Sequence, residues 1–314
     1  MMPADIEQEY ASQLPTWKKL KDEAVFTLEQ AIASASLKIH QIESRVKELD
    51  SFVSKAYASS YADPLNHIKD IVGVRIITLF KSNLDLIDEI IHREFKVISK
   101  DDKTDDDKSA FGYQSIHYIC MIRPDCSGPR YRDISGHSFE VQARTLCMHA
   151  WAAVSHHLDY KGDWDVPKEL KKSLQALSGL FHVADSQFEQ FFLTREKYKR
   201  KTARIGLVGH KDLNLETLYE YSRKKFPDKK PASKDDISKI VQEFLRVGIA
   251  NIDKVNELVD LATLSVLEIE EKGNFKFAAP GALRVSIGLA SQDYRNLKYG
   301  GRTLEQAKEL FSKA

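Results

Sequence analysis

A dense run of β-branched residues at positions 69–79, KDIVGVRIITL, constrains the fold of this chain most strongly. Only Gly73 and Arg75 interrupt its apolar residues between positions 71 and 77, which is typical of a buried strand. Asp70 at the start of the run and Arg75 inside it are costly to bury. They indicate either a structural ion pair or a functional site, and this stretch alone leaves both readings open.

The overall composition favours a soluble protein with two domains rather than one. Its 314 residues, 42% of them hydrophobic, can bury a substantial core. The 47 basic and 46 acidic side chains nearly balance, which argues against a protein that coats nucleic-acid duplexes but allows a local basic patch. Cys120, Cys126 and Cys147 match no zinc spacing, and this usage favours a reducing, cytoplasmic setting. The polar N-terminus is unlike a signal peptide, and no apolar run is long enough to cross a membrane, so we expect no membrane partner.

Hydrophobic periodicity predicts both helices and strands in the first part of the chain. We expect a helical region at 13–61, the buried strand at 69–79 and a helix at 84–95. A charged irregular loop is expected at 99–110. Arg45, Lys47 and Lys55 fall near the end of the helical region, where a group of cations is usually a solvated face.

Two more strands follow at 115–122 and 138–145. A polar connector with prolines and glycines separates them, so we expect an antiparallel hairpin with a long loop. The second strand alternates apolar residues with an acid, an amide and a guanidinium, which are Glu140, Gln142 and Arg144. Such a polar face usually meets water, but the helix expected at 146–158 is rich in histidine rather than plainly charged. The face is therefore a candidate site.

The last third of the chain predicts a helical accessory or partner-binding domain. A boundary after a long helix divides the chain into residues 1–203 and residues 204–314. Asn214 and Ser233 have the pattern of helix N-caps. Four helices are expected beyond the boundary, at 215–225, 235–247, 252–270 and 303–312. The segment 273–301 contains glycine and proline and receives no assignment.

Without reference to any family, the charged residues of the first two-thirds suggest a nucleotide site. Asp70 and Glu140 are carboxylates at strand positions, and two converging carboxylates can hold Mg²⁺ with phosphate oxygens and water. Cations suit a polyphosphate, and the chain offers Arg45, Lys47, Lys55 and Arg75. Tyr113 follows a glycine and can stack on a base, and His117 lies on the next strand. Because no Walker A sequence, kinase glycine loop or HExxH motif is present, the residues favour a metal-dependent nucleotide-transferring enzyme of another type.

In their order and residue identity, these motifs resemble the sequence of the RelA/SpoT-type alarmone synthetases over about residues 40–165. The motifs are RVK at 45–47, Lys55, DIVGVRI at 70–76, GYQSIH at 112–117, and FEVQART and HAWAAVSHHLDYK at 139–161. The resemblance implies an α/β fold with a mixed β-sheet flanked by helices, related to the polymerase-β-like nucleotidyltransferases. It also implies a synthetase-only member that moves the β,γ-pyrophosphate of ATP to the ribose 3′-hydroxyl of GDP or GTP. The products would be AMP and the alarmone ppGpp or pppGpp, so the expected enzyme is a GTP/GDP pyrophosphokinase.

The resemblance also implies roles for individual residues. Asp70 is expected to bind Mg²⁺, and Glu140 to help hold the metal and to activate the 3′-hydroxyl. The residues expected to bind ATP are the base-sandwiching Arg45 and Arg75 and the phosphate-binding Lys47 and Lys55. The residues expected at the acceptor nucleotide are Tyr113, stacked on guanine, with His117 and Gln142 at phosphate or ribose. The chain departs from the family pattern at Phe111, Ala153 and Ala143. The first two bear on the choice of acceptor more than on the transfer, and Ala143 is a mild change to a smaller inward side chain.

Two other functions remain open from the sequence. A toxin-type relative would transfer pyrophosphate to the 3′ end of tRNA and inhibit translation, and the basic stretch at 195–204 could grip a tRNA backbone. A nucleotide sensor that has lost its chemistry is the other, although Asp70 and Glu140 together argue against it. For His149, His156 and His157 on one helix, packing is expected rather than metal binding. A homo-oligomer or a regulatory partner at the C-terminal domain is also possible.

Overall fold

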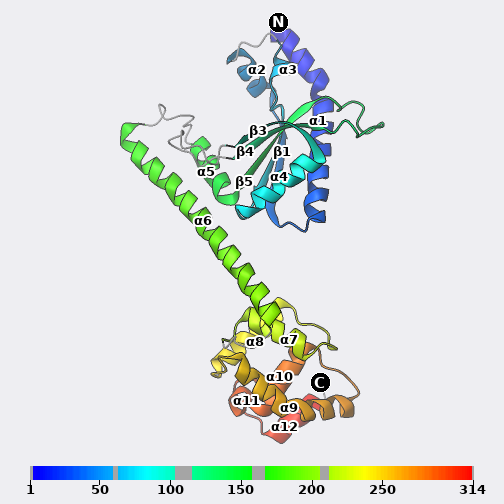
Figure 1. The fold of residues 1–314 in the computed structure, drawn as a ribbon, viewed down its shortest axis with the longest axis vertical. Helices are drawn as coiled ribbons and strands as arrows, with labels where there is room; N and C mark the ends of the chain where they lie inside the picture. The colour runs from blue at the N-terminus through cyan, green and yellow to red at the C-terminus, as the bar shows by residue number, and fades with distance from the viewer. Residues whose placement is uncertain (1–2, 59–62, 103–114, 158–166, 206–211, 313–314) are drawn as a thin grey trace. The chain divides into compact units, whose positions relative to one another are not determined.

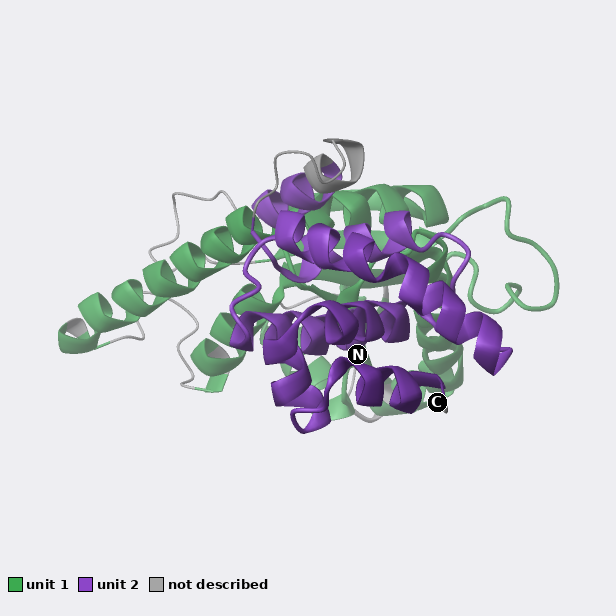
Figure 2. Ribbon diagram, turned by 90° about the horizontal axis from the view of Figure 1, so that it is seen from below, with its two compact units in different colours: residues 1–192 green, residues 193–314 purple. Residues whose placement is uncertain are grey.

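A computed structural model describes residues 3–58, 63–102, 115–157, 167–205 and 212–312 of the chain (Figure 1). The chain divides into two compact units, Met1–Phe192 and Leu193–Ala314 (Figure 2). The domain boundary expected after residue 203 stays a prediction, because α6, Lys168–Ile205, runs across the limit between the two units.

The first unit contains a five-stranded sheet in the order β1-β2-β5-β4-β3. Its strands are β1 Ile39–Val46, β2 Val72–Thr78, β3 Phe95–Asp102, β4 Ile116–Ile122 and β5 Ser138–Thr145. The central pair β2 and β5 is parallel, and the other three pairs are antiparallel. The expected mixed sheet flanked by helices is therefore confirmed, as is the antiparallel pairing of the strands predicted at 115–122 and 138–145.

The first unit also contains helices. They are α1 Pro3–Ser34, α2 Leu49–Ala58, α3 Pro64–His67, α4 Ser82–Glu94 and α5 Leu146–His157, followed by α6. Figure 1 shows α1 and α4 beside the sheet. Apolar residues of both helices, such as Leu20 and Ile87, are fully buried in one core with the strands.

Side-chain alternation explains why one face of the sheet is core and the other is available for a site. On β5, Phe139, Val141 and Ala143 are fully buried, while Glu140 and Gln142 point to the opposite face. Similar alternation buries Val72, Val74 and Ile76 on β2 and Ile116, Tyr118 and Cys120 on β4. The polar side chains of neighbouring strands therefore share one face of the sheet.

The predicted helical region at 13–61 is wrong in its middle, because β1 separates α1 from α2. A β-bulge between Ile39 and Gln41 disturbs the alternation of apolar and polar residues in β1. The remaining spacing of its apolar residues resembles that of a helix. Arg45 consequently lies on a strand rather than on a helix. The charged loop predicted at 99–110 begins instead as the end of β3, and its positions from 103 lie outside the described residues.

The second unit is helical, as the sequence predicts. Its helices are α7 Leu215–Lys225, α8 Lys234–Arg246, α9 Ile252–Gly273, α10 Ala279–Ala290, α11 Gln292–Tyr299 and α12 Leu304–Ser312. Both predicted N-caps are confirmed, since Asn214 and Ser233 each form a capping box. The segment 273–301 that received no assignment contains α10 and α11. Among the described helices, none is both long enough and apolar enough to cross a membrane.

Candidate active site

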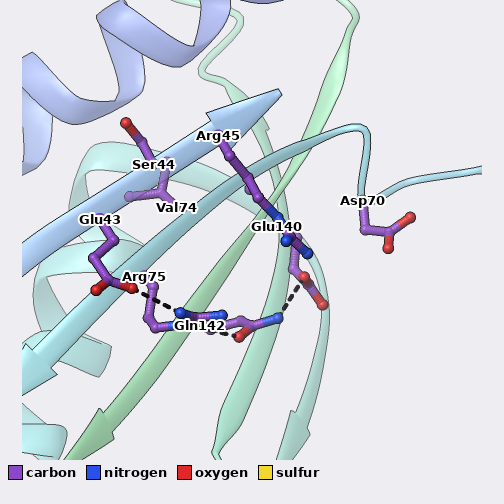
Figure 3. Close-up of a pocket in the computed structure, with 9 residues that line it drawn as sticks. Glu43, Ser44, Arg45, Asp70, Val74, Arg75, Glu140 and Gln142 are labelled. Atoms are coloured by element: carbon purple, nitrogen blue, oxygen red, sulfur yellow. Dashed lines mark hydrogen bonds and ion pairs between the residues drawn. The ribbon is translucent and has the colours of Figure 1, made fainter. Parts of the chain in front are cut away.

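A pocket of about 220 Å³ lies on the polar face of the sheet, where β1, β2 and β5 run side by side (Figure 3). Its lining residues are Glu43, Ser44, Arg45, Asp70, Gly73, Val74, Arg75, Glu140 and Gln142. The strand register creates the pocket by forming two rows of residues across the three strands. The rows are Arg45, Gly73 and Glu140, and Glu43, Arg75 and Gln142.

Gly73 keeps the centre of the first row open. It stands between Arg45 and Glu140, and a Cβ atom added to it would meet no atom within 4 Å. Figure 3 shows Arg45 extending from β1 toward Glu140 across this position. The absence of a side chain at Gly73 therefore leaves space between a cation and a carboxylate.

Asp70 lies in the turn before β2 and forms ion pairs with two lysines. Lys47 Nζ and Lys55 Nζ each lie 2.9 Å from one of its carboxylate oxygens. Burial alone would raise the pKa of Asp70, but the hydrogen bonds and charges of Lys55 and Lys47 outweigh it, so that pKa lies below its usual value. The backbone also fixes Lys47, because its N–H donates to the Ile71 carbonyl at 2.7 Å and its carbonyl accepts from the Tyr10 hydroxyl at 2.6 Å.

Glu140 projects from β5 with both carboxylate oxygens hydrogen-bonded. One oxygen lies 2.7 Å from His117 Nδ1, and the other accepts from Gln142 Nε2 at 2.7 Å. Burial and the nearby charge of Asp70 raise the pKa of Glu140, but the contributions of His117 and Gln142 lower it more, so that pKa is below its usual value. Glu140 is therefore ionised at neutral pH.

Arg75 occupies the second row between an acid and an amide. Its Nη1 donates to Glu43 Oε2 at 2.7 Å, and its Nε donates to Gln142 Oε1 at 3.5 Å. His149 on α5 approaches the same group, with Nε2 3.9 Å from Glu43 Oε1. Burial lowers the pKa of His149, and the cations Arg75 and Arg144 lower it further against the opposing effect of Glu43.

Comparison with known proteins identifies the fold that carries this pocket. A family model described as "Region found in RelA / SpoT proteins" matches residues 44–165. The GTP pyrophosphokinase YwaC of Bacillus subtilis (strain 168) is 30% identical over 155 residues, which are 48% of this chain and 71% of that protein. The chain belongs to the RelA/SpoT family.

Two further comparisons agree with this membership. The GTP pyrophosphokinase YjbM of the same organism is 30% identical over 158 residues, again 48% of this chain and 71% of that protein. The crystal structure of small alarmone synthetase 1 from Bacillus subtilis has the same fold, with a TM-score of 0.52 at 22% identity. That likeness covers 60% of this chain and 98% of the other chain. The resemblance inferred from the sequence motifs is confirmed.

The structure brings most of the predicted site residues of this RelA/SpoT member together. Those that line the pocket are Arg45, Asp70, Arg75, Glu140 and Gln142. Lys47 and Lys55 reach it through Asp70, and His117 reaches it through Glu140. Tyr113 lies outside the described residues, so its predicted place at the acceptor base stays a prediction.

Three residues of this region received no role from the sequence. Glu43 lines the pocket two positions before Arg45, and its place becomes visible only when the segment is treated as a strand. Ser115 and Arg144 do not line the pocket, are 5% and 7% exposed, and connect to His117 and Gln142. Their own contact, from Arg144 Nη2 to Ser115 Oγ, joins segments that are distant in sequence, and sequence spacing does not reveal it.

The carboxylates of the pocket fit a magnesium site better than a site for a metal that requires three or more protein ligands. Within the described ranges, no cluster of three or more histidine, cysteine, aspartate or glutamate side chains could hold a metal ion. Mg²⁺ usually takes only one or two carboxylates and completes its shell with water and substrate phosphates. Asp70 and Glu140 supply two carboxylates that face the same pocket and repel each other, so this pair suits Mg²⁺ bound together with a nucleotide.

Proposed function

We propose that this protein transfers the β,γ-pyrophosphate of ATP to the ribose 3′-hydroxyl of GDP or GTP, releasing AMP and producing ppGpp or pppGpp. The observation that carries the proposal is the pocket that Asp70 and Glu140 line together with the cations Arg45 and Arg75, with Arg45 and Glu140 on either side of the open position of Gly73. Family membership supports it, because the relatives YwaC and YjbM are named GTP pyrophosphokinases.

The donor nucleotide binds through the cations of the pocket. Arg45 and Arg75 project from neighbouring strands and hold the adenine between their guanidinium planes, which stack well on flat rings. Lys47 and Lys55 leave Asp70 and bind the phosphates, whose negative charge they neutralise. The backbone of Lys47 is anchored on both sides, which fixes the point on the chain from which its side chain reaches the phosphates.

Asp70 and Glu140 would hold Mg²⁺ together with the bound nucleotide. The metal would neutralise charge on the phosphates during transfer. Before the ligands bind, the chain itself keeps both carboxylates ionised, as the lowered pKa values of Asp70 and Glu140 indicate.

The acceptor is activated by position rather than by a strong base. The 3′-oxygen forms a bond to the β-phosphorus of ATP while the bond from that phosphorus to the bridging α,β-oxygen breaks, and AMP leaves with the electron pair. Glu140 accepts the hydrogen bond of the 3′-hydroxyl and then its proton. His117 and Gln142 fix the carboxylate from behind, so the hydroxyl is aligned with the β-phosphorus.

An acceptor assay tests this function directly. The full chain is incubated with Mg²⁺ and ATP labelled at the γ-phosphate, with GDP, GTP or bulk tRNA as the acceptor. We expect label on the guanosine nucleotide and one AMP released per transfer. Label that appears only on tRNA would refute the proposal and favour the toxin-type activity, for which the basic stretch at 195–204 is the candidate contact.

The variant Glu140→Gln separates an enzyme from a nucleotide sensor. The amide keeps the shape of the side chain but carries no charge and accepts no proton, so we expect the transfer rate to fall at least about a hundredfold. ATP binding, measured by calorimetry without turnover, should change little. Glu48→Gln, at an exposed residue outside the pocket, serves as the matched control. Transfer at the wild-type rate by Glu140→Gln would contradict the role of Glu140.

We further propose that residues 1–203 carry this activity and that residues 204–314 form an accessory domain. The pocket and all its lining residues belong to the first part. The second part has its own buried cores, which suits a module for a regulatory partner or a further copy of the chain.

A further inference from the structure

The carboxylate of Glu140 is the end point of two hydrogen-bond chains that begin at one buried arginine. In the first chain, Arg144 Nη2 lies 3.3 Å from Ser115 Oγ, Ser115 Oγ lies 2.8 Å from His117 Nε2, and His117 Nδ1 lies 2.7 Å from Glu140. In the second chain, the same Nη2 donates to Gln142 Oε1, and Gln142 Nε2 donates to the other oxygen of Glu140 at 2.7 Å. The five residues form a closed ring.

The chemistry of the groups gives the ring a direction. A guanidinium has donors and no acceptor, so Arg144 can only donate to the oxygens of Ser115 and Gln142. The Gln142 amide must then turn its NH₂ group toward Glu140. An ionised carboxylate favours a hydrogen on the facing Nδ1 atom of His117, and a Ser115 hydroxyl hydrogen directed at Nε2 favours the same tautomer. Its Nε2 is then an acceptor and takes the hydroxyl hydrogen of Ser115.

Arg144 is suited to be the first donor of both hydrogen-bond chains because it does not line the open pocket. Its side chain is 7% exposed, and its Nε atom has no hydrogen-bond partner among the described residues. Burial and the charge of Arg75 lower the pKa of Arg144 to about 10, so it remains a cation at neutral pH. Arg75 also donates to Gln142, but the proposed function moves that guanidinium onto the adenine. Arg144 lies on the same face of the sheet as Glu140 and Gln142 but is not among the residues that line the pocket.

We propose that Arg144 is a positioning residue for the transfer reaction, which holds the neutral Nδ1–H form of His117 through Ser115 and the amide orientation of Gln142 directly, so that Glu140 faces the acceptor in one fixed orientation. This inference rests on the proposed function for its catalytic consequence. The hydrogen-bond chains themselves are independent of that function. Arg144 acts through its neighbours and does not touch the nucleotides.

Three variants separate the two chains. Arg144→Met removes the head of both chains, Ser115→Ala removes only the histidine chain, and Arg144→Lys returns a donor-only cation to the same place. Loss of an outer hydrogen-bond partner typically lowers activity 10- to 100-fold. We expect kcat to fall by this factor in Arg144→Met and less in Ser115→Ala, with KM for ATP within about twofold. Arg144→Lys should recover part of kcat.

Nuclear magnetic resonance measures the histidine directly in the full chain without nucleotides. The ¹³C and ¹⁵N shifts of histidine rings distinguish the two neutral tautomers, and His117→Gln identifies the signal. We expect the Nδ1–H form to dominate in the wild type and to lose its dominance in Arg144→Met and in Ser115→Ala. Arg295→Met is the matched control, because Arg295 is a buried arginine of the second unit with an equally unpartnered Nε among the described residues.

The outcomes are decisive in both directions. A folded Arg144→Met variant that keeps its kcat, or that keeps the wild-type tautomer of His117, overturns the proposal. If Arg144→Met does not fold, Ser115→Ala decides by the same two measurements. If Arg295→Met lowers kcat as much as Arg144→Met, the effect is general to buried arginines and the proposal also fails. A wild-type chain without transfer activity would refute the proposed function, while the tautomer measurement would still support or overturn the positioning by Arg144.

Discussion

Gly73 is the residue whose missing side chain has the clearest consequence for the pocket. It stands in the row between Arg45 and Glu140, and the space above it is open. Its backbone is not in the left-handed region, so conformational freedom does not explain a glycine here. The open space beside Gly73 instead supports the proposed binding of a ligand at this position.

Replacing Gly73 by valine should close the pocket without harming the fold. The new side chain extends into open space, and valine is favourable in strands. We expect KM for ATP to rise about tenfold or more, a loss of about 1.4 kcal/mol of binding, with little change in Tm. Gly73→Ala should give a smaller effect. Gly179→Ala, also made into open space but on α6, is the control, and unchanged ATP binding in Gly73→Val would refute this role of Gly73.

At the residue scale, the sequence predicts the charges that stand out from their surroundings. Asp70 and Arg75 interrupt an apolar run, and Glu140 and Gln142 alternate with buried residues, so each is visible in one dimension. Glu43 cannot be recognised in this way, because the bulge in β1 conceals the strand on which Glu43 lies. The roles of Ser115 and Arg144 depend on contacts between two strands that are distant in sequence.

At the element scale, both strands that the sequence missed are edge strands of the sheet. β1 and β3 end the strand order, and each contains a bulge. Edge strands often carry charges and bulges that discourage pairing with other chains, which removes the apolar alternation that reveals a strand. The central strands β2, β4 and β5 have that alternation or a buried run, and all three are predicted. α10 was missed for another reason, since it is buried on most sides and contains Gly288, where a Cβ would lie 2.9 Å from Tyr299.

Glu243 on α8 joins three helices of the second unit. It accepts hydrogen bonds from Tyr294 at 2.6 Å and from Arg284 at 2.9 and 3.2 Å, and Lys298 Nζ lies 2.7 Å away. Burial would raise the pKa of Glu243, but these partners lower it to about 2. Its stabilising effect is therefore present above about pH 4.5, the ordinary value, and is lost as the pH falls toward 2.

Glu243→Gln should destabilise the second unit in a pH-dependent way. Removing a hydrogen-bonded charge of this kind costs on the order of 2–3 kcal/mol at neutral pH, since Arg284 is left partly buried without its partner. Thermal unfolding followed from pH 7 to pH 2.5 measures the difference from wild type, which should shrink below pH 4.5. Glu257→Gln, at an exposed glutamate paired only with Lys254 among the described residues, is the control. A difference that stays constant with pH would contradict the assignment.

At the scale of the whole molecule, the two units have separate cores. The buried cluster of the first unit draws its residues from Ile6 to Leu174, and the two clusters of the second draw theirs from Leu213 to Phe311. Among the described residues, no buried residue belongs to clusters of both units. Each unit can therefore be destabilised without the other.

Calorimetry of the full chain should show two unfolding transitions. Phe244 and Phe139 are fully buried in different units, and replacing either by alanine costs about 3–5 kcal/mol. We expect Phe244→Ala to lower only the transition of the second unit and Phe139→Ala only that of the first. If both variants lower the same single transition, the units unfold as one and this prediction is wrong.

The pairing of Asp70 with Lys47 and Lys55 couples the binding of the two ligands proposed for this site. A nucleotide that arrives alone must draw both lysines away from Asp70 and leaves an unpaired carboxylate behind. A divalent cation that arrives alone must sit beside two displaced ammonium groups. Each ligand therefore removes the cost that the other would meet, and by thermodynamic linkage each must tighten the binding of the other by the same factor. For the two proposed ligands, the salt bridges of Asp70 with Lys47 and Lys55 would therefore make binding synergistic and would favour the metal–nucleotide complex over either component.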